Sequence, residues 1–227
     1  MLKWSEFRGW MAFDRLSEDE GVTRAFTVGY RFNDDPADPW TARFNAFKRQ
    51  PHAALRRAGA MMRDAVPSLV EGLAEDLGLV TSKTVFVPAL SSSETVASPG
   101  GVLWRLAQFC AECSGVEFAG ERITKNAHEQ LHGHHDASKR SAILAAADFR
   151  SEEIRADNVL ILDDFITRGS TMSHLARAML ERNPELLIFA VALGKTERRS
   201  YCRENFGVEI SNEHVPSRWE RRWLDAK

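Results

Sequence analysis

The sequence predicts an α/β fold in which a central parallel sheet is flanked by helices, and two observations lead to that prediction. Apolar runs at residues 84–87, 158–162 and 186–193 have the character of strands buried on both faces, as parallel strands are. Segments with helical periodicity stand between and after those runs. Strands that alternate with helices in this way are typical of βαβ units.

Length and composition fit one domain of this kind. The chain has 227 residues, of which 44% are hydrophobic and 27% are charged, which are ordinary values for a globular protein. We treat residues 1–227 as a single domain. Within it, residues 1–40 form a hairpin or a small hood, residues 41–206 form the core, and residues 207–227 form a tail that contributes to the hood.

Net charge and cysteine content limit which classes of partner and which cellular compartment are expected. The net charge is −2 and the pI is near 6.4, so nothing global indicates nucleic acid, which attracts basic domains. Three cysteines suit a reducing cytoplasm better than a disulfide scaffold. We see no apolar run of membrane-spanning length and no signal peptide. We therefore expect a cytoplasmic protein with a small-molecule ligand, and the sequence leaves a homodimer open.

Helices are expected on both sides of the apolar runs. Apolar residues recur at spacings of three and four between Thr41 and Leu77, and Pro67 is predicted to divide this stretch into two helices. Further helices are predicted from Gly101 to Ala111, and over residues 141–147, 170–181 and 196–205. The histidine-rich stretch at 124–139 is predicted to be a loop.

The most informative motif runs from Val159 to Thr171. Four apolar residues lead to the carboxyl end of a strand, where ligands bind in open α/β sheets. Asp163 and Asp164 follow, and then a short loop of Thr167, Arg168, Gly169, Ser170 and Thr171 leads into a helix. Gly169 permits a sharp turn and close approach to a ligand. Backbone N–H groups at a helix start favour an anion such as phosphate.

Two carboxylates beside such a loop suggest a sugar and a cation. Ribose hydroxyls can donate to Asp163 and Asp164, and the same oxygens attract a hard cation such as Mg²⁺. A plainer alternative is an acid-capped helix in which Ser170 is an ordinary N-cap. A Walker-type ATPase is a second alternative, but Phe189 stands where the first P-loop glycine before Gly194-Lys195-Thr196 would have to be.

This segment resembles the motif of type I phosphoribosyltransferases that binds 5-phosphoribosyl 1-pyrophosphate (PRPP). The shared pattern is an apolar strand, Asp-Asp, two apolar residues and a Thr-x-Gly-x-Thr loop. Arg168 departs from it, because that loop position is usually small in the family. The departure places a bulky charge at the rim of a phosphate site that backbone groups would form.

Within this superfamily the chain is most similar to the ComF-like group, named for a competence protein. Residues 43–49 resemble that group's lysine-containing segment, and residues 85–90 resemble the strand end before its pyrophosphate loop. Arg122, Gln130, Arg140 and Phe149 follow the spacing of its flexible loop. The chain lacks the group's four-cysteine zinc module, and residues 91–101 replace its Arg-Gly-Asn segment. Cys110 and Cys113 are expected to be core residues rather than metal ligands.

The resemblance implies Mg²⁺-dependent transfer of a phosphoribosyl group from PRPP to a nitrogen nucleophile, with release of pyrophosphate. It assigns the 5-phosphate to residues 167–171 and the ribose hydroxyls to Asp163 and Asp164. The residues expected to bind or neutralise pyrophosphate are Ala89, Leu90, Ser91, Lys48, Lys125, Lys139 and Arg140. Some members of the superfamily sense PRPP or nucleotides, or assist DNA uptake, without known catalysis, so a non-catalytic role stays open.

A competing motif lies in the histidine-rich stretch. Residues 128–132 match the H-E-x-x-H pattern in which two histidines hold Zn²⁺ and Glu129 acts as general base. Polar neighbours on both sides would leave a helix there little to bury. We therefore favour the interpretation that this stretch is a polar loop that covers the active site. A surface metal site formed by His132, His134 and His135 is an open alternative.

Overall fold

The computed structural model describes residues 3–129 and 136–226. Within them, one sheet has the order β1–β2–β3–β9–β8–β4–β5, and β6 pairs with β7 separately. The strands are β1 (Ser5–Phe7), β2 (Trp10–Phe13), β3 (Arg24–Phe32), β4 (Thr84–Pro88), β5 (Glu117–Phe118), β6 (Ile123–Thr124), β7 (Arg150–Ser151), β8 (Asn158–Ile166) and β9 (Leu187–Glu197). The helices are α1 (Pro39–Arg49), α2 (Pro51–Leu77), α3 (Val102–Ser114), α4 (Ala137–Ala146), α5 (Ser170–Leu180), α6 (Arg199–Phe206) and α7 (Ser217–Asp225), with a short 3₁₀ turn at Thr81–Lys83.

The main sheet is mostly parallel, which confirms the predicted fold class. β3, β9, β8, β4 and β5 pair in parallel, whereas β1 and β2 form an antiparallel hairpin that joins the sheet at β3. The parallel strands are joined by crossovers that contain helices, as the alternation in the sequence predicted.

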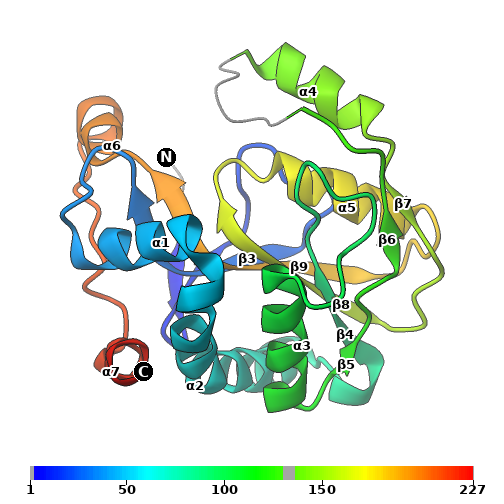
Figure 1. The fold of residues 1–227 in the computed structure, drawn as a ribbon, viewed down its shortest axis with the longest axis horizontal. Helices are drawn as coiled ribbons and strands as arrows, with labels where there is room; N and C mark the ends of the chain where they lie inside the picture. The colour runs from blue at the N-terminus through cyan, green and yellow to red at the C-terminus, as the bar shows by residue number, and fades with distance from the viewer. Residues whose placement is uncertain (1–2, 130–135, 227) are drawn as a thin grey trace.

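Successive residues of the central strands face opposite layers. Leu160 and Leu162 lie in one core with α2, α3 and α7, whereas Val159 and Ile161 lie in a second core with α5. Figure 1 shows α2 and α3 on one side of the sheet and α5 on the other. Both faces of β8 are therefore covered, which explains why all four residues from Val159 to Leu162 are apolar.

The prediction that Pro67 divides a helical stretch is wrong. The break falls at Gln50, because Pro51 takes the first position of α2, where a missing N–H costs nothing. α2 then continues through Pro67 to Gly78, which caps it with φ 71°. Buried residues flank Pro67 on both sides, including Met62, Val66 and Val70. Their packing outweighs the single hydrogen bond that proline removes.

Two strands are longer than their apolar runs. β8 continues through both aspartates to Ile166, and β9 continues to Glu197, past the point where a helix was predicted to begin. The tail contains α7, which buries Trp219 and Trp223 against α2 and α1. No helix among the described residues has the length and apolarity needed to cross a bilayer.

The strand ends create the ligand edge. Pro88, the last residue of β4, pairs with Leu162, so the last four residues of β8 extend beyond β4. On its other side β8 stays paired with β9 as far as Ile166. The aspartates are therefore held by β9 and open toward the loop that follows β4.

Candidate functional site

Asp163 and Asp164 lie on the overhanging end of β8. Asp163 pairs in register with Ala192 of β9, and both aspartates are half-buried. One carboxylate oxygen of Asp163 accepts a hydrogen bond from the Asp164 N–H at 2.7 Å. The backbone thus fixes the two carboxylates at the carboxyl end of a central strand, which is where the sequence predicted them.

The electrostatic environment of Asp163 favours its protonated form. Burial is the largest cause that raises its pKa well above the ordinary value, and repulsion from Asp164 adds to it. The hydrogen bond from the Asp164 N–H and the charge of Lys48 oppose this shift without cancelling it. A cation near the pair would lower the pKa of Asp163, so the site is disposed to accept positive charge.

A short loop, residues 167–169, joins the strand that carries the carboxylates to the start of α5. Gly169 is the N-cap of α5, with φ 92°, and no side chain caps the helix. Ser170 is therefore the first residue of the helix and not its N-cap, contrary to the plainer alternative. The first N–H groups of a helix have no intrahelical acceptor, so an anion at this position would find donors and a favourable dipole.

A second loop supports the first from outside. A Cβ atom added at Gly169 would lie 2.7 Å from Cβ of Asp19, so no other residue fits there without a shift. Asp19 is buried, and its carboxylate accepts the Leu16 N–H at 2.7 Å. The Glu18 N–H donates to the carbonyl of Arg168 at 2.8 Å. The loop between β2 and β3 therefore fixes the conformation of residues 167–171.

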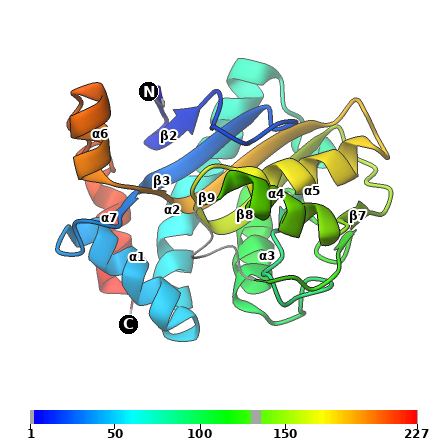
Figure 2. The same ribbon diagram turned by 90° about the horizontal axis from the view of Figure 1, so that it is seen from above.

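Arg168, the departure from the family pattern, is turned toward this supporting loop. Its guanidinium lies 3.2 Å from the Glu18 carboxylate, which also accepts from Arg140 of α4 at 2.9 Å. α4 lies beside α5 (Figure 2). Glu18 thus joins the phosphate-type loop to the helix that follows the histidine-rich segment. Neither Glu18 nor this contact could be anticipated from sequence spacing.

Phe165, the residue after the two aspartates, has two cations near its ring. Its ring lies 5.4 Å from Cζ of Arg31 and 5.6 Å from Nζ of Lys48. Burial lowers the pKa of Arg31, and the charge of Asp164 opposes that change. The sequence predicted Lys48 for the site but missed Arg31, because only the pairing of β3 beside β9 brings residue 31 to this edge.

The loop after β4 is already occupied by a carboxylate of the chain itself. Glu94 accepts hydrogen bonds from the N–H groups of Ser91, at 2.8 Å, and Ser98, at 3.3 Å. Burial alone would raise the pKa of Glu94, but these hydrogen bonds outweigh it and the pKa is lowered. The Ala89 N–H donates to the carbonyl of Leu162 at 2.8 Å. Two of the three amides predicted to bind pyrophosphate, those of Ala89 and Ser91, therefore already have acceptors.

The remaining predicted basic residues lie in different settings. Lys125 is buried, and its ammonium group donates to the Ser92 carbonyl at 3.0 Å, so it supports the loop after β4 from within. Burial lowers the pKa of Lys125. Lys139 is exposed on α4, one residue before Arg140. Leu90 is buried. The structure thus brings Lys48 to the aspartates, and Lys125 to the other loop.

Lys195 is a charged residue near the site that the sequence did not indicate for it. It pairs in register with Ile166 at the end of β9, is 1% exposed, and donates to Glu197 at 3.3 Å. Burial lowers its pKa, and Glu197 opposes the shift. A lysine on an apolar strand could be read only as a P-loop candidate from sequence, since its burial depends on the neighbouring strands.

The residues of the competing zinc hypothesis are described only in part. The ring of half-buried His128 lies 6.4 Å from that of Phe149, and the backbone N–H of His128 donates to the Ser92 carbonyl. Residues 130–135, which include His132, His134 and His135, lie outside the described residues. Among the described residues, no three metal-binding side chains converge. Cys110 is buried and Cys113 half-buried on α3, and burial raises the pKa of both thiols.

The mostly parallel central sheet flanked by helices matches the type I phosphoribosyltransferase fold. Residues 64–215 match the phosphoribosyl transferase domain family. The chain belongs to that family. The matched segment begins within α2 and ends before α7, so it includes the aspartates, the loop after β4 and the loop after β8.

Two solved structures of phosphoribosyltransferases show a weak similarity to this chain. A xanthine-guanine-hypoxanthine phosphoribosyltransferase from Helicobacter pylori is 11% identical, with a TM-score of 0.34 over 58% of this chain and 80% of that one. A hypoxanthine phosphoribosyltransferase from Staphylococcus aureus is 12% identical, with a TM-score of 0.37 over 62% of this chain and 74% of that one. A comparison with curated proteins found no match.

Proposed function

We propose that this protein binds PRPP together with Mg²⁺ and transfers the 5-phosphoribosyl group to a nitrogen nucleophile. The observation that carries the proposal is the adjacency of two features at the end of β8. An uncapped helix start, suited to a phosphate, follows two carboxylates suited to ribose hydroxyls after a short loop. Membership of the phosphoribosyl transferase domain family supports the same reading.

The residues present fit a magnesium ion. Mg²⁺ is usually bound through one or two carboxylates together with substrate phosphates and water, and Asp163 and Asp164 supply two carboxylates at the open strand end. Burial, and then repulsion from Asp164, raise the pKa of Asp163, and a bound cation would oppose that rise. When bound, the ion would neutralise charge on the pyrophosphate leaving group.

In the proposed reaction the bond between ribose C1 and the pyrophosphate oxygen breaks, and a bond from C1 to the acceptor nitrogen forms. Positive charge develops on the ribose ring during the transfer. Asp163 and Asp164 stabilise that charge and accept hydrogen bonds from the ribose hydroxyls. The N–H groups at the start of α5 hold the 5-phosphate, and Gly169 permits the close approach.

One observation favours a second candidate function, a non-catalytic sensor of PRPP or a nucleotide. The carboxylate of Glu94 accepts hydrogen bonds from the N–H groups of Ser91 and Ser98. Pyrophosphate would therefore have to displace this carboxylate or bind elsewhere. A ligand with a single phosphate needs only the loop at 167–171. The narrower resemblance to ComF-like proteins stays a prediction, and so does the zinc alternative.

Two measurements test the proposal. Calorimetry with PRPP and Mg²⁺ should detect binding to the wild type, and the double variant Asp163→Asn with Asp164→Asn should bind much more weakly. No binding by the wild type would overturn the proposal. Release of pyrophosphate during incubation with a panel of nucleobases separates an enzyme from a sensor. Stoichiometric zinc that is lost in His128→Ala would instead favour the metalloprotease reading.

A further inference from the structure

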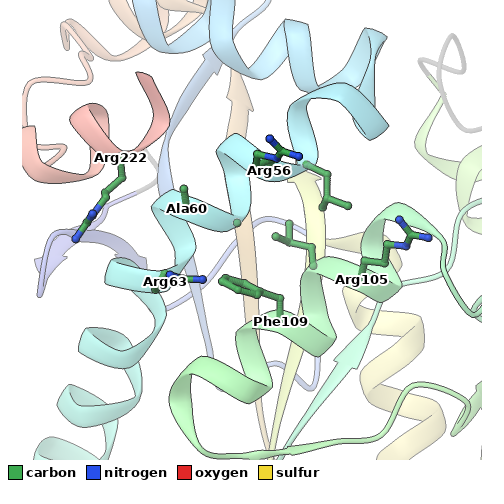
Figure 3. Close-up of a pocket in the computed structure, with 9 residues that line it drawn as sticks. Arg56, Ala60, Arg63, Arg105, Phe109 and Arg222 are labelled. Carbon is green, nitrogen blue, oxygen red and sulfur yellow. The ribbon is translucent and has the colours of Figure 1, made fainter. Parts of the chain in front are cut away.

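A hollow on the helical face of the molecule, away from the aspartates, carries a second set of cations. It lies among α2, α3 and α7 and has a volume of about 350 Å³. This volume falls within the roughly 300–1,000 Å³ that small-molecule sites occupy. Figure 3 shows residues of all three helices around the hollow. None of the residues that line it belongs to the site described above.

The floor of the hollow is apolar because small residues on α2 face larger ones on α3. Gly59 and Ala60 leave the space open, and a Cβ atom at Gly59 would only touch the Phe109 ring at 3.7 Å. Phe109 is half-buried, so part of its ring faces the opening. The remaining floor residues are Leu55 and Leu106. Such a floor suits a flat, apolar ring.

The rim is formed by arginines. Arg56 and Arg63 come from α2, Arg105 from α3 and Arg222 from α7. Arg222 is paired with Asp64 at 2.9 Å. Arg63 lies over the Phe109 ring at 5.4 Å. Neither Arg63 nor Arg105 forms an ion pair with any residue in the part of the chain that the structure describes. Exposed cations gathered around one hollow are notable in a chain whose net charge is −2.

These observations point to a planar organic anion, and we propose that the hollow binds a nucleoside phosphate. A guanidinium group binds phosphate bidentately and stacks on flat rings. The apolar floor beside Phe109 would take the base, and an arginine of the rim, Arg63 or Arg105, would take the phosphate. A peptide helix would need a longer groove than this compact hollow, and an acyl chain would gain little from the charged rim.

The hollow is connected to the loop that follows β4. Gly100 stands at the end of that loop, with φ 83°, and a Cβ atom built there would lie 3.6 Å from Nη2 of Arg105. A phosphate that draws Arg105 into the hollow would change the surroundings of this loop. The proposed site would therefore serve as an effector site, whatever the acceptor of the transfer reaction is.

The test is calorimetric titration with GMP and AMP, in a background that weakens the loop at 167–171. Ser170→Asp places a negative charge at the start of α5 and repels a phosphate there, so binding that remains reports on the hollow. We expect saturable binding in this background. Arg63→Gln combined with Arg105→Gln should weaken it at least tenfold. Arg155→Gln combined with Arg203→Gln removes the same charge from exposed arginines elsewhere and should leave it unchanged.

A second variant tests whether binding needs the open space of the hollow, without changing the charge of its rim. Ala60→Trp fills the space while keeping every arginine, and it should also abolish binding. Hydrogen exchange should show protection by GMP within α2 and α3. Either of two results would overturn the proposal. One is no nucleotide binding in the Ser170→Asp background. The other is that the protein forms a dimer and binds no nucleotide, and that Ala60→Trp dissociates this dimer. That result would make the hollow a self-association surface.

Discussion

The two loops at the ligand edge of the sheet differ in what satisfies their amides. The loop at 167–171 has no internal acceptor at the start of α5, and Gly169 and the β2–β3 loop hold it open. The loop at 89–101 is closed on the carboxylate of Glu94. One loop is thus preorganised for an external anion, and the other already holds an anion of the chain. Preorganised donors need no rearrangement to bind, so the 5-phosphate end of PRPP should dominate its affinity.

Ser170→Asp should give the largest effect on this difference. A carboxylate at the first position of α5 would repel a phosphate from amides that would otherwise donate two or three charge-assisted hydrogen bonds. At about 1.5–3 kcal/mol each, their loss predicts at least about a 100-fold weaker affinity for PRPP by calorimetry. Ser217→Asp, at the start of the likewise uncapped α7, is the matched control. Equal weakening in both variants would contradict the assignment.

Asp163→Asn should weaken Mg²⁺-dependent PRPP binding by roughly tenfold or more, because the bound cation favours the ionised form of Asp163 and hydrogen bonds to a charged group contribute about 1.5–3 kcal/mol. The same substitution should make the protein more stable than the wild type. Because the folded-state pKa of Asp163 is raised, the wild type loses stability as pH rises above about 4. The asparagine does not titrate, so its unfolding free energy relative to wild type should increase with pH.

Urea titrations at several pH values measure this trend. Asp157→Asn, an exposed aspartate at the opposite edge of the sheet, is the control and should show neither effect. A relative stability of Asp163→Asn that falls as pH rises would show that Asp163 is not held near its neutral form.

Glu94→Gln should open the loop at 89–101, which Glu94 closes. Removal of the charge takes away a repulsion that is worth roughly 1 kcal/mol at close range in water. Affinity for pyrophosphate should therefore rise about fivefold, measured by titration calorimetry. Stability should fall by about 1 kcal/mol near neutral pH, after allowance for solvent screening. Because the pKa of Glu94 is lowered, this loss should vanish as pH falls through that pKa.

The control for this change is Glu121→Gln, which removes an exposed charge elsewhere. Unchanged pyrophosphate affinity in Glu94→Gln would mean that this loop does not receive the leaving group. The sensor reading would then gain weight over the transferase reading.

Glu18→Gln should give the smallest effect. It releases Arg168 and Arg140 from their shared carboxylate, and partly exposed pairs of this kind contribute about 0.2–1 kcal/mol. Arg168 then becomes available to a phosphate, so PRPP affinity should rise by no more than about fivefold. Glu20→Gln, two residues along the same loop, is the control. A loss of affinity in Glu18→Gln would show that its pairing with Arg168 is needed to shape the phosphate loop.

Sequence patterns were most reliable where local chemistry decides the outcome. Periodicity and burial on both faces identified the central strands, and Gly169 with its neighbours identified the turn into α5. Patterns failed where a distant contact decides the outcome. Pro67 did not end a helix, because residues on both sides of it are buried by other elements. The N–H group of Ser91 was predicted to bind pyrophosphate, but in the structure it donates to the carboxylate of Glu94.

The sequence by itself determined the fold class, the acidic strand end and the loop that follows it, because these depend on residues that are neighbours in the chain. Only the tertiary structure decided the surroundings of that loop. Strand order brings Arg31 beside Asp164, and the loop between β2 and β3 brings Asp19 against Gly169. The packing of α2, α3 and α7 gathers arginines around a hollow. Such contacts join residues far apart in the chain, and no local spacing encodes them.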